Sequence, residues 1–340
     1  MPGRWHLYSE ARLLQTRLCD LPLRIEGGII EERKHRLYEE LEAKALRFRP
    51  HFWLSQEWFT PDGVPGIAVP FYLAHPRLVR LERQFMLEAE GATESQCMRI
   101  LRHEAGHAID NAFRLHRRHR WKELFGSFND PYPDAYRPRP ASKRYVHHLN
   151  GWYAQAHPAE DFAETFAVWL TPGYPWRKRY AGWPALEKLL YVDELMGELA
   201  GQTAPVRTRR QIEPLREAKV TLAEHYERKR DHYSVEWPGY YDRDLRRIFE
   251  VDTGKKVSAT RPAASAFLRT HRREFSRKVS EASGVPAYTI DQLLKNMIER
   301  CRQMKLRLRE SPTRTREQML LMLTVHTMHV AHAGYFPIAV

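Results

Sequence analysis

The decapeptide LRHEAGHAID, residues 101–110, places two histidines and a glutamate inside an otherwise apolar stretch. Apolar residues recur at helical spacing around it, and Thr93 followed by Gln96 forms a capping-box pattern. The segment is therefore predicted to be a helix of about twenty residues. Burying two imidazoles and a carboxylate costs free energy unless they bind something. The stretch therefore raises the question of what these side chains bind, and a divalent metal is the candidate.

The spacing within this stretch is the HExxH pattern. On a helix, His103 and His107 are separated by about 6 Å along the axis and face the same way, so both can present a nitrogen to one ion. Glu104 is rotated by about 100° and lies beside them, where a carboxylate can take a proton from water. The alternative interpretation is that the HExxH pattern occurs here by chance, on a helix with a purely structural role.

A catalytic zinc ion needs a third protein ligand and an open position. His116 and His119 lie in the strongly basic LHRRHRW and are interpreted as solvated. A better source is WYAQAHPAEDFAETF, where Glu160 and Glu164 share one face of a predicted helix. We expect Glu160 to be the third ligand and Glu164 to accept a hydrogen bond from a zinc-bound imidazole. For Asp110, a hydrogen bond to an imidazole and simple exposure to solvent remain equal alternatives.

These motifs also carry a family resemblance. HEAGH, WKELFG and WYAQAHPAEDFAETFAVWL resemble a bacterial family of zinc-binding metallopeptidases, over roughly residues 95–200. More distantly, the pattern Tyr-x6-Glu-x3-Glu resembles the lethal-factor-like and Pro-Pro-endopeptidase gluzincins. The resemblance implies that Glu160 binds zinc, that Glu164 supports the site and that Tyr153 stabilises the oxyanion. The chain departs from relatives that carry an N-terminal zinc ribbon, because it lacks the cysteines for one.

The predicted activity is a zinc-dependent metallopeptidase, with Zn²⁺ as cofactor and a peptide or protein as substrate. Zn²⁺ would polarise the carbonyl and lower the pKa of water, and Glu104 would act as general base. Tyr153 would supply an oxyanion donor, and the less favoured alternative is a core aromatic residue beside Trp152. Because zincins commonly pair a peptide with an edge strand, GIAVPFYLA at residues 66–74 is the expected substrate strand.

The predicted fold class is α+β and helix-dominated: a zincin-like catalytic core with a small mixed sheet and an active-site helix, plus a C-terminal helical module. Residues 51–59 and 66–74 are β-rich and flank the turn TPDGVPG. We expect a metallopeptidase domain over residues 1–202 and a basic helical module over 203–340, joined by a linker at 203–214. An apolar stripe from Ile290 to Leu308 is predicted to lie on one helix.

The charge is concentrated in the predicted C-terminal module. The whole chain has a formal charge of +13, and residues 201–340 contain 27 Lys and Arg against 16 Asp and Glu. This excess supports an alternative function, a regulatory, nucleic-acid-binding or partner-binding protein whose zincin core is structural or of restricted activity. Nucleic acid is the less favoured partner, because the basic residues are not interleaved with aromatics and no nucleic-acid-binding motif is present.

Cysteine usage and hydropathy indicate the compartment. The three cysteines are widely separated and form no CxxC pair, which favours reduced thiols in a cytoplasmic protein. Neither a membrane-spanning apolar stretch nor a secretory signal is visible, so we expect no membrane association. His326, His329 and His332 recur every three residues, a spacing that turns them away from a single ion and makes a second metal site unfavoured.

Overall fold

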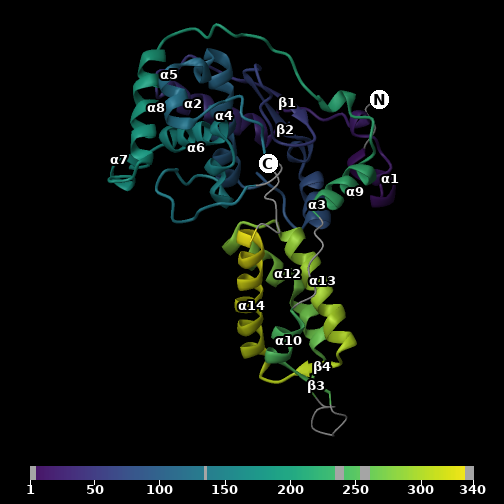
Figure 1. Ribbon diagram of the computed structural model, residues 1–340. Coiled ribbons are helices and arrows are strands. Elements are labelled where there is room, and N and C mark those ends of the chain that lie inside the picture. The colour runs from purple at the N-terminus through teal and green to yellow at the C-terminus, as the bar shows by residue number, and fades with distance from the viewer. Residues whose placement is uncertain (1–4, 134–135, 234–240, 253–260, 334–340) are drawn as a thin grey trace. The chain divides into compact units, whose positions relative to one another are not determined.

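The computed structural model describes residues 5–133, 136–233, 241–252 and 261–333, with side chains in the last helix described up to Met328 (Figure 1). The chain divides into two compact units: of the described residues, the first comprises those within 5–82 and 89–226 and the second those within 83–88 and 227–333. The first unit therefore extends beyond the boundary expected after residue 202. None of the described helices combines the length and the hydrophobicity that a membrane span requires.

The first unit is mainly helical. In chain order its elements are η1 (Trp5–Leu7), α1 (Glu10–Leu14), η2 (Leu18–Asp20), α2 (Ile29–Glu42), β1 (His51–Ser55), β2 (Gly66–Pro70), η3 (Phe71–Ala74), α3 (Pro76–Met86), α4 (Glu94–Phe113), η4 (Leu115–Arg117), α5 (His119–Phe125), η5 (Asn150–Gln155), α6 (Pro158–Leu170), α7 (Trp176–Arg179), α8 (Ala185–Leu199), η6 (Leu215–Glu217) and α9 (Leu222–His232). The boundary between the units falls within α3 and α9.

The core of this unit is built on α4 and α6. Figure 1 shows these helices among α2, α5 and α8, and α4 packs against α6 and α2 while α6 packs against α5 and α8. The predicted start of α4 is confirmed, because the Thr93 side chain accepts a hydrogen bond from the Gln96 amide. The predicted start of α6 is also confirmed, with Pro158 in its first turn. Proline fits there because the first amides of a helix have no carbonyl partner.

The small sheet lies beside α4. Strands β1 and β2 pair in parallel, and the Ala68 amide of β2 donates to the Phe59 carbonyl on its other side. Residues Ile67, Ala68 and Val69 are fully buried. The expectation that this segment offers a free edge to a peptide is therefore wrong at its centre, because the chain itself occupies both neighbours of Ala68.

The last residues of the segment expected to be a linker lie along β1. Side chains of three alternate strand residues, His51, Trp53 and Ser55, bond to the carbonyls of Arg210, Ile212 and Glu213. Because successive side chains of a strand point to opposite faces, residues at this spacing share a face and can hold one extended segment. This part of the chain therefore belongs to the first compact unit.

The second unit is a helical bundle with a short two-stranded sheet, whose strands are separated in the chain by two of the described helices. Its elements are α10 (Asp242–Ile248), β3 (Phe249–Val251), α12 (Ala264–Ser283), α13 (Ala287–Gln303), β4 (Leu306–Leu308) and α14 (Pro312–Ala333), and β3 pairs with β4 in antiparallel fashion. The predicted single stripe is corrected, because α13 ends at Gln303 and Lys305 adopts a φ of 51°. Leu306 and Leu308 reach the same core from the strand.

The helix-dominated architecture with small sheets is thus confirmed for the described residues, whereas the zincin-like relationship of the core remains a prediction. The trio expected in the last helix is described only in part: the ring of His326 bonds to Asp244, and the other two side chains lie outside the described residues.

Candidate metal centre

Two buried helices bring the site together at one close crossing. An added Cβ at Gly106, in the middle of HEAGH, would lie 2.7 Å from the Cα and 3.0 Å from the carbonyl oxygen of Ala163. Ordinary contacts between carbon atoms are about 3.5–4.0 Å, so only glycine lets the backbones of α4 and α6 approach this closely. The crossing sets one turn of α4 directly against the turn of α6 that contains both predicted glutamates.

Three potential ligand atoms converge at this crossing. His103 Nε2 and His107 Nε2 are 3.1 Å apart, and Glu160 Oε2 lies 3.0 Å from the first and 3.1 Å from the second. A tetrahedral zinc ion with ligands at 2.0–2.1 Å would hold its ligands about 3.3 Å apart. The donor set and its triangle therefore fit zinc, and these three residues form a group that could hold a metal ion.

Glu164 fixes the orientation of the first histidine. Its Oε1 accepts from His103 Nδ1 at 2.8 Å, and its Oε2 accepts from the Leu149 amide at 2.8 Å. Because Nδ1 carries the proton in this bond, the lone pair of a neutral ring lies on Nε2 and points at the convergence point. The structure thus places the two glutamates on different nitrogens of His103, Glu160 at Nε2 and Glu164 at Nδ1.

The electrostatics of the site call for a cation. Burial by itself would lower the pKa of His103, but hydrogen bonds to Glu160 and Glu164 outweigh it and raise this pKa well above its usual value. Burial would likewise raise the pKa of Glu160, whereas the neighbouring His107 and His103 hold it well below the usual range. Buried carboxylates in this arrangement require positive charge nearby, from a proton or from a metal ion.

The predicted general base lies beside the ligand triangle with its own partner. Glu104 is 7% exposed, and its Oε2 accepts a hydrogen bond of 2.8 Å from the hydroxyl of Thr60. Thr60 belongs to the segment between β1 and β2, which the sequence marked only as a turn. No sequence signal distinguished this threonine from an ordinary turn residue.

Two tyrosines reach the site from the segment before α6. The ring of Tyr153 lies 5.5 Å from the ring of His103, and burial, with nearby Glu160 and Glu104, raises its pKa well above the usual value. The hydroxyl of Tyr132 donates to Glu160 Oε1 at 3.0 Å. Tyr132 was missed because it lies in a proline-rich loop, where no periodicity indicates which side chains turn inward.

His157 explains how Tyr132 is held. Its Nδ1 accepts from the Ala159 amide as the N-cap of α6, and its Nε2 donates to the Asp130 carbonyl. The Tyr132 ring stacks on the His157 ring with centroids 3.8 Å apart. The histidine that precedes Pro158 therefore joins the start of α6 to the loop that reaches Glu160.

Asp110 and the two basic-stretch histidines lie elsewhere. Asp110 is buried, and its two oxygens accept from the His116 amide at 2.7 Å and the His116 Nδ1 at 2.6 Å. His116 is therefore not simply solvated, whereas the side chain of His119 is 89% exposed. The imidazole that Asp110 contacts thus belongs to the segment after α4.

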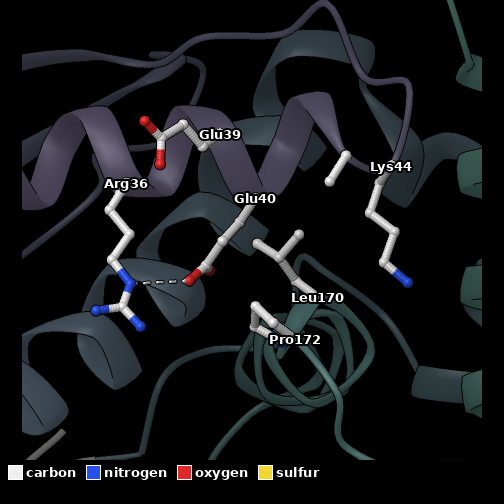
Figure 2. A pocket seen from close by; sticks show the side chains of 7 residues that line it. Arg36, Glu39, Glu40, Lys44, Leu170 and Pro172 are labelled. Carbon is white, nitrogen blue, oxygen red and sulfur yellow. Dashed lines mark ion pairs between the residues drawn. The ribbon is translucent and has the colours of Figure 1, made fainter.

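A separate cleft of about 260 Å³ lies between α2 and the C-terminal end of α6 (Figure 2). Its lining residues are Arg36, Glu39, Glu40, Ala43, Lys44, Leu170 and Pro172. Arg36 pairs with Glu40 at 3.7 Å, and Glu40 also accepts two bonds of 2.7 Å from Arg102 of α4. These contacts occupy the carboxylate and tie α2 to the helix of the candidate metal centre.

Comparison with known proteins agrees with this geometry over one segment. Residues 96–172 match the model of a family described as "Putative zinc-binding metallo-peptidase". The matched segment covers α4 from Gln96 onward and all of α6, and therefore includes all three potential ligands. Neither the curated proteins nor the solved structures contain a match to the chain.

Proposed function

We propose that this protein is a zinc-dependent metallopeptidase of the gluzincin type, with His103, His107 and Glu160 as metal ligands. The observation that carries the proposal is the triangle of donor atoms 3.0–3.1 Å apart at the crossing of two buried helices. The match of residues 96–172 to a family of zinc-binding metallopeptidases supports it independently. The substrate would be a peptide or a protein.

When bound, Zn²⁺ would polarise the scissile carbonyl and lower the pKa of water towards 7. Glu104 then serves as the general base that accepts a proton from the attacking water and returns it to the leaving amine. Glu164 keeps the lone pair of His103 directed at the ion. Tyr153, whose ring lies beside His103, donates a hydrogen bond to the developing oxyanion.

The alternative of a nucleic-acid-binding protein finds less support in the second unit. Several of its basic side chains are engaged with acids: Arg300 pairs with Asp242, Arg302 with Glu299, and Lys295 with Asp291. Paired charges contribute less to the electrostatic attraction of a phosphate backbone. We also propose a cytoplasmic location, because Cys19, Cys97 and Cys301 are free thiols.

Metal content tests the first half of the proposal. Protein purified without a metal-affinity step should contain one zinc ion per chain, and His107→Ala should lose it. The matched control is His119→Ala, which changes an exposed histidine of the same unit and should retain the metal. Equal zinc content in the two variants, or its absence from the wild type, would contradict the ligand assignment.

Hydrolysis of a quenched-fluorescence peptide mixture tests the second half. Glu104→Gln should keep the fold and the zinc but abolish cleavage, because an amide cannot accept the water's proton. Tyr153→Phe should lose about 100-fold, as expected for one oxyanion donor. Glu123→Gln, which alters an exposed carboxylate on α5, is the control. Full activity in Glu104→Gln would remove the peptidase assignment.

A further inference from the structure

The turn between β1 and β2 is attached to the active-site helix at two points. At one point the Thr60 hydroxyl meets Glu104, and at the other the side chain of Asn111 meets the turn itself. Glu104 and Asn111 are seven residues apart on α4, two helical turns, so their side chains lie on the same face. The turn therefore lies along the face of α4 that carries the candidate general base.

Asn111 holds the turn with its whole amide group. Its Oδ1 accepts from the Gly63 amide at 3.0 Å, and its Nδ2 donates to the Pro61 and Val64 carbonyls at 3.0 and 3.2 Å. Within the turn, the Val64 amide donates to Pro61, and Gly63 has a φ of +72°. A positive φ at the third position of a four-residue turn favours glycine. The position of Thr60 is thus fixed by contacts that do not involve the metal.

The hydroxyl of Thr60 has a single proton for two nearby acceptors. The carboxylate oxygen Oε2 of Glu104 is 2.8 Å away, and the backbone oxygen of the same residue is 3.3 Å away. The backbone oxygen of a residue in mid-helix already accepts the helical hydrogen bond. A charged acceptor at the shorter distance gives the stronger bond, so the proton belongs to Oε2.

We propose that Thr60 is a positioning residue for the general base, holding Glu104 Oε2 so that Oε1 is left to exchange a proton with water. This inference rests on the proposed peptidase function and assigns a role to a residue outside both helical motifs. A glutamate side chain has three rotatable bonds, and a small misplacement of a catalytic group reduces turnover strongly. The turn and Asn111 thereby contribute to catalysis through Glu104, without contacting the substrate.

Steady-state kinetics test this role on the zinc-loaded protein, with the quenched-fluorescence peptide that the wild type cleaves fastest. Thr60→Val removes the hydroxyl at nearly constant volume, and we expect kcat to fall about 10- to 100-fold. KM and zinc content should stay at wild-type values, and the thermal midpoint should fall only by the small amount that the loss of one hydrogen bond implies. Thr60→Ser restores a hydroxyl and should recover most of kcat. An unchanged kcat in Thr60→Val, or no recovery in Thr60→Ser, would overturn the proposal.

Thr171→Val is the matched control. Thr171 is also half-buried in the first unit, and its hydroxyl donates at 2.8 Å to a helix carbonyl, that of Ala167, rather than to a carboxylate. The same substitution there should leave kcat unchanged. An equal loss of kcat in both variants would show that the effect comes from general destabilisation and would count against Thr60 as a positioning residue.

A second measurement examines the hydrogen bond without activity. In zinc-free protein, Thr60→Val and Glu104→Ala are combined in a double-mutant cycle on the unfolding equilibrium constant. A bond to a charged group should give a coupling of about tenfold or more. Additive effects would refute the bond itself. Coupling without any wild-type hydrolysis would instead overturn the peptidase function, and with it the catalytic role of Thr60.

Discussion

Replacement of Gly106 by alanine tests the close crossing of α4 and α6 directly. The new Cβ would meet the Ala163 Cα at 2.7 Å, the Ala163 carbonyl oxygen at 3.0 Å and the Ala163 Cβ at 3.2 Å. Ordinary contact is about 3.5–4.0 Å, so the helices must separate by about 1 Å. Zinc–ligand distances depart from their standard values by only about 0.2 Å. Glu160 would then leave the reach of an ion held by the two histidines.

The expected effects on stability and on zinc binding differ in size. In a helix, Gly→Ala contributes up to about 1 kcal/mol of stability, whereas overpacking costs about 1–3 kcal/mol. The free energy of unfolding of the zinc-free protein should therefore fall by up to about 2 kcal/mol. The zinc dissociation constant should rise at least about tenfold, comparable to the loss of a group that orients a ligand.

Chelator competition measures the zinc affinity, and urea unfolding measures the stability. Gly197→Ala in α8 is the matched control, because Gly197 is exposed and nothing lies within 4 Å of its added Cβ. It should keep the zinc affinity and lose no stability. Adding Ala163→Gly to Gly106→Ala should not restore zinc binding, since the two shortest contacts are with backbone atoms. Wild-type zinc affinity together with increased stability in Gly106→Ala would refute the reasoning.

Two further predictions concern neighbouring side chains. Tyr132→Phe removes the hydroxyl that donates to Glu160 Oε1, so zinc affinity in chelator competition should fall while the fold is kept; unchanged affinity would contradict a role for this bond. Burial lowers the pKa of His148 to about 4, although its Nε2 donates to the Arg99 carbonyl. As the pH falls from 7 to 5, this histidine takes up a proton in the unfolded chain but not in the folded one, which favours unfolding. The free energy of unfolding, measured with urea, should therefore fall over this range by about 2 kcal/mol more in the wild type than in His148→Gln.

The sequence predicted the two helices of the site because local geometry determines them. The spacing of His103 and His107 places both on one helical face, and the capping pattern at Thr93 sets where α4 begins. Pro158 marks the start of α6 in the same way. These features depend on residues fewer than about five positions apart, so the residues alone carry the information.

The sequence indicated less clearly where a helix ends and which segments pack beside a strand. The apolar stripe after Ile290 continues to Leu308, yet α13 ends at Gln303 and the last two leucines enter a strand. Apolar spacing reports which residues are buried but not whether a chain reversal intervenes. The segment 203–214 was predicted to be a linker because it is polar, and a polar composition suits an attached surface segment as well as a free one. Only the contacts of its last residues with β1 show that this part is attached to the first unit.

The atomic contacts within the site were decided by tertiary structure. Glu160 was the expected ligand from its place near the start of α6 and from the family resemblance, and the crossing at Gly106 sets its carboxylate against both Nε2 atoms and that of Glu164 against His103 Nδ1. Thr60 reaches Glu104 across 44 positions of sequence. Such contacts depend on how separate elements pack, which local patterns do not specify. The sequence by itself therefore determined the chemistry carried by each helix, and the packing of α4 against α6 decided which atoms meet.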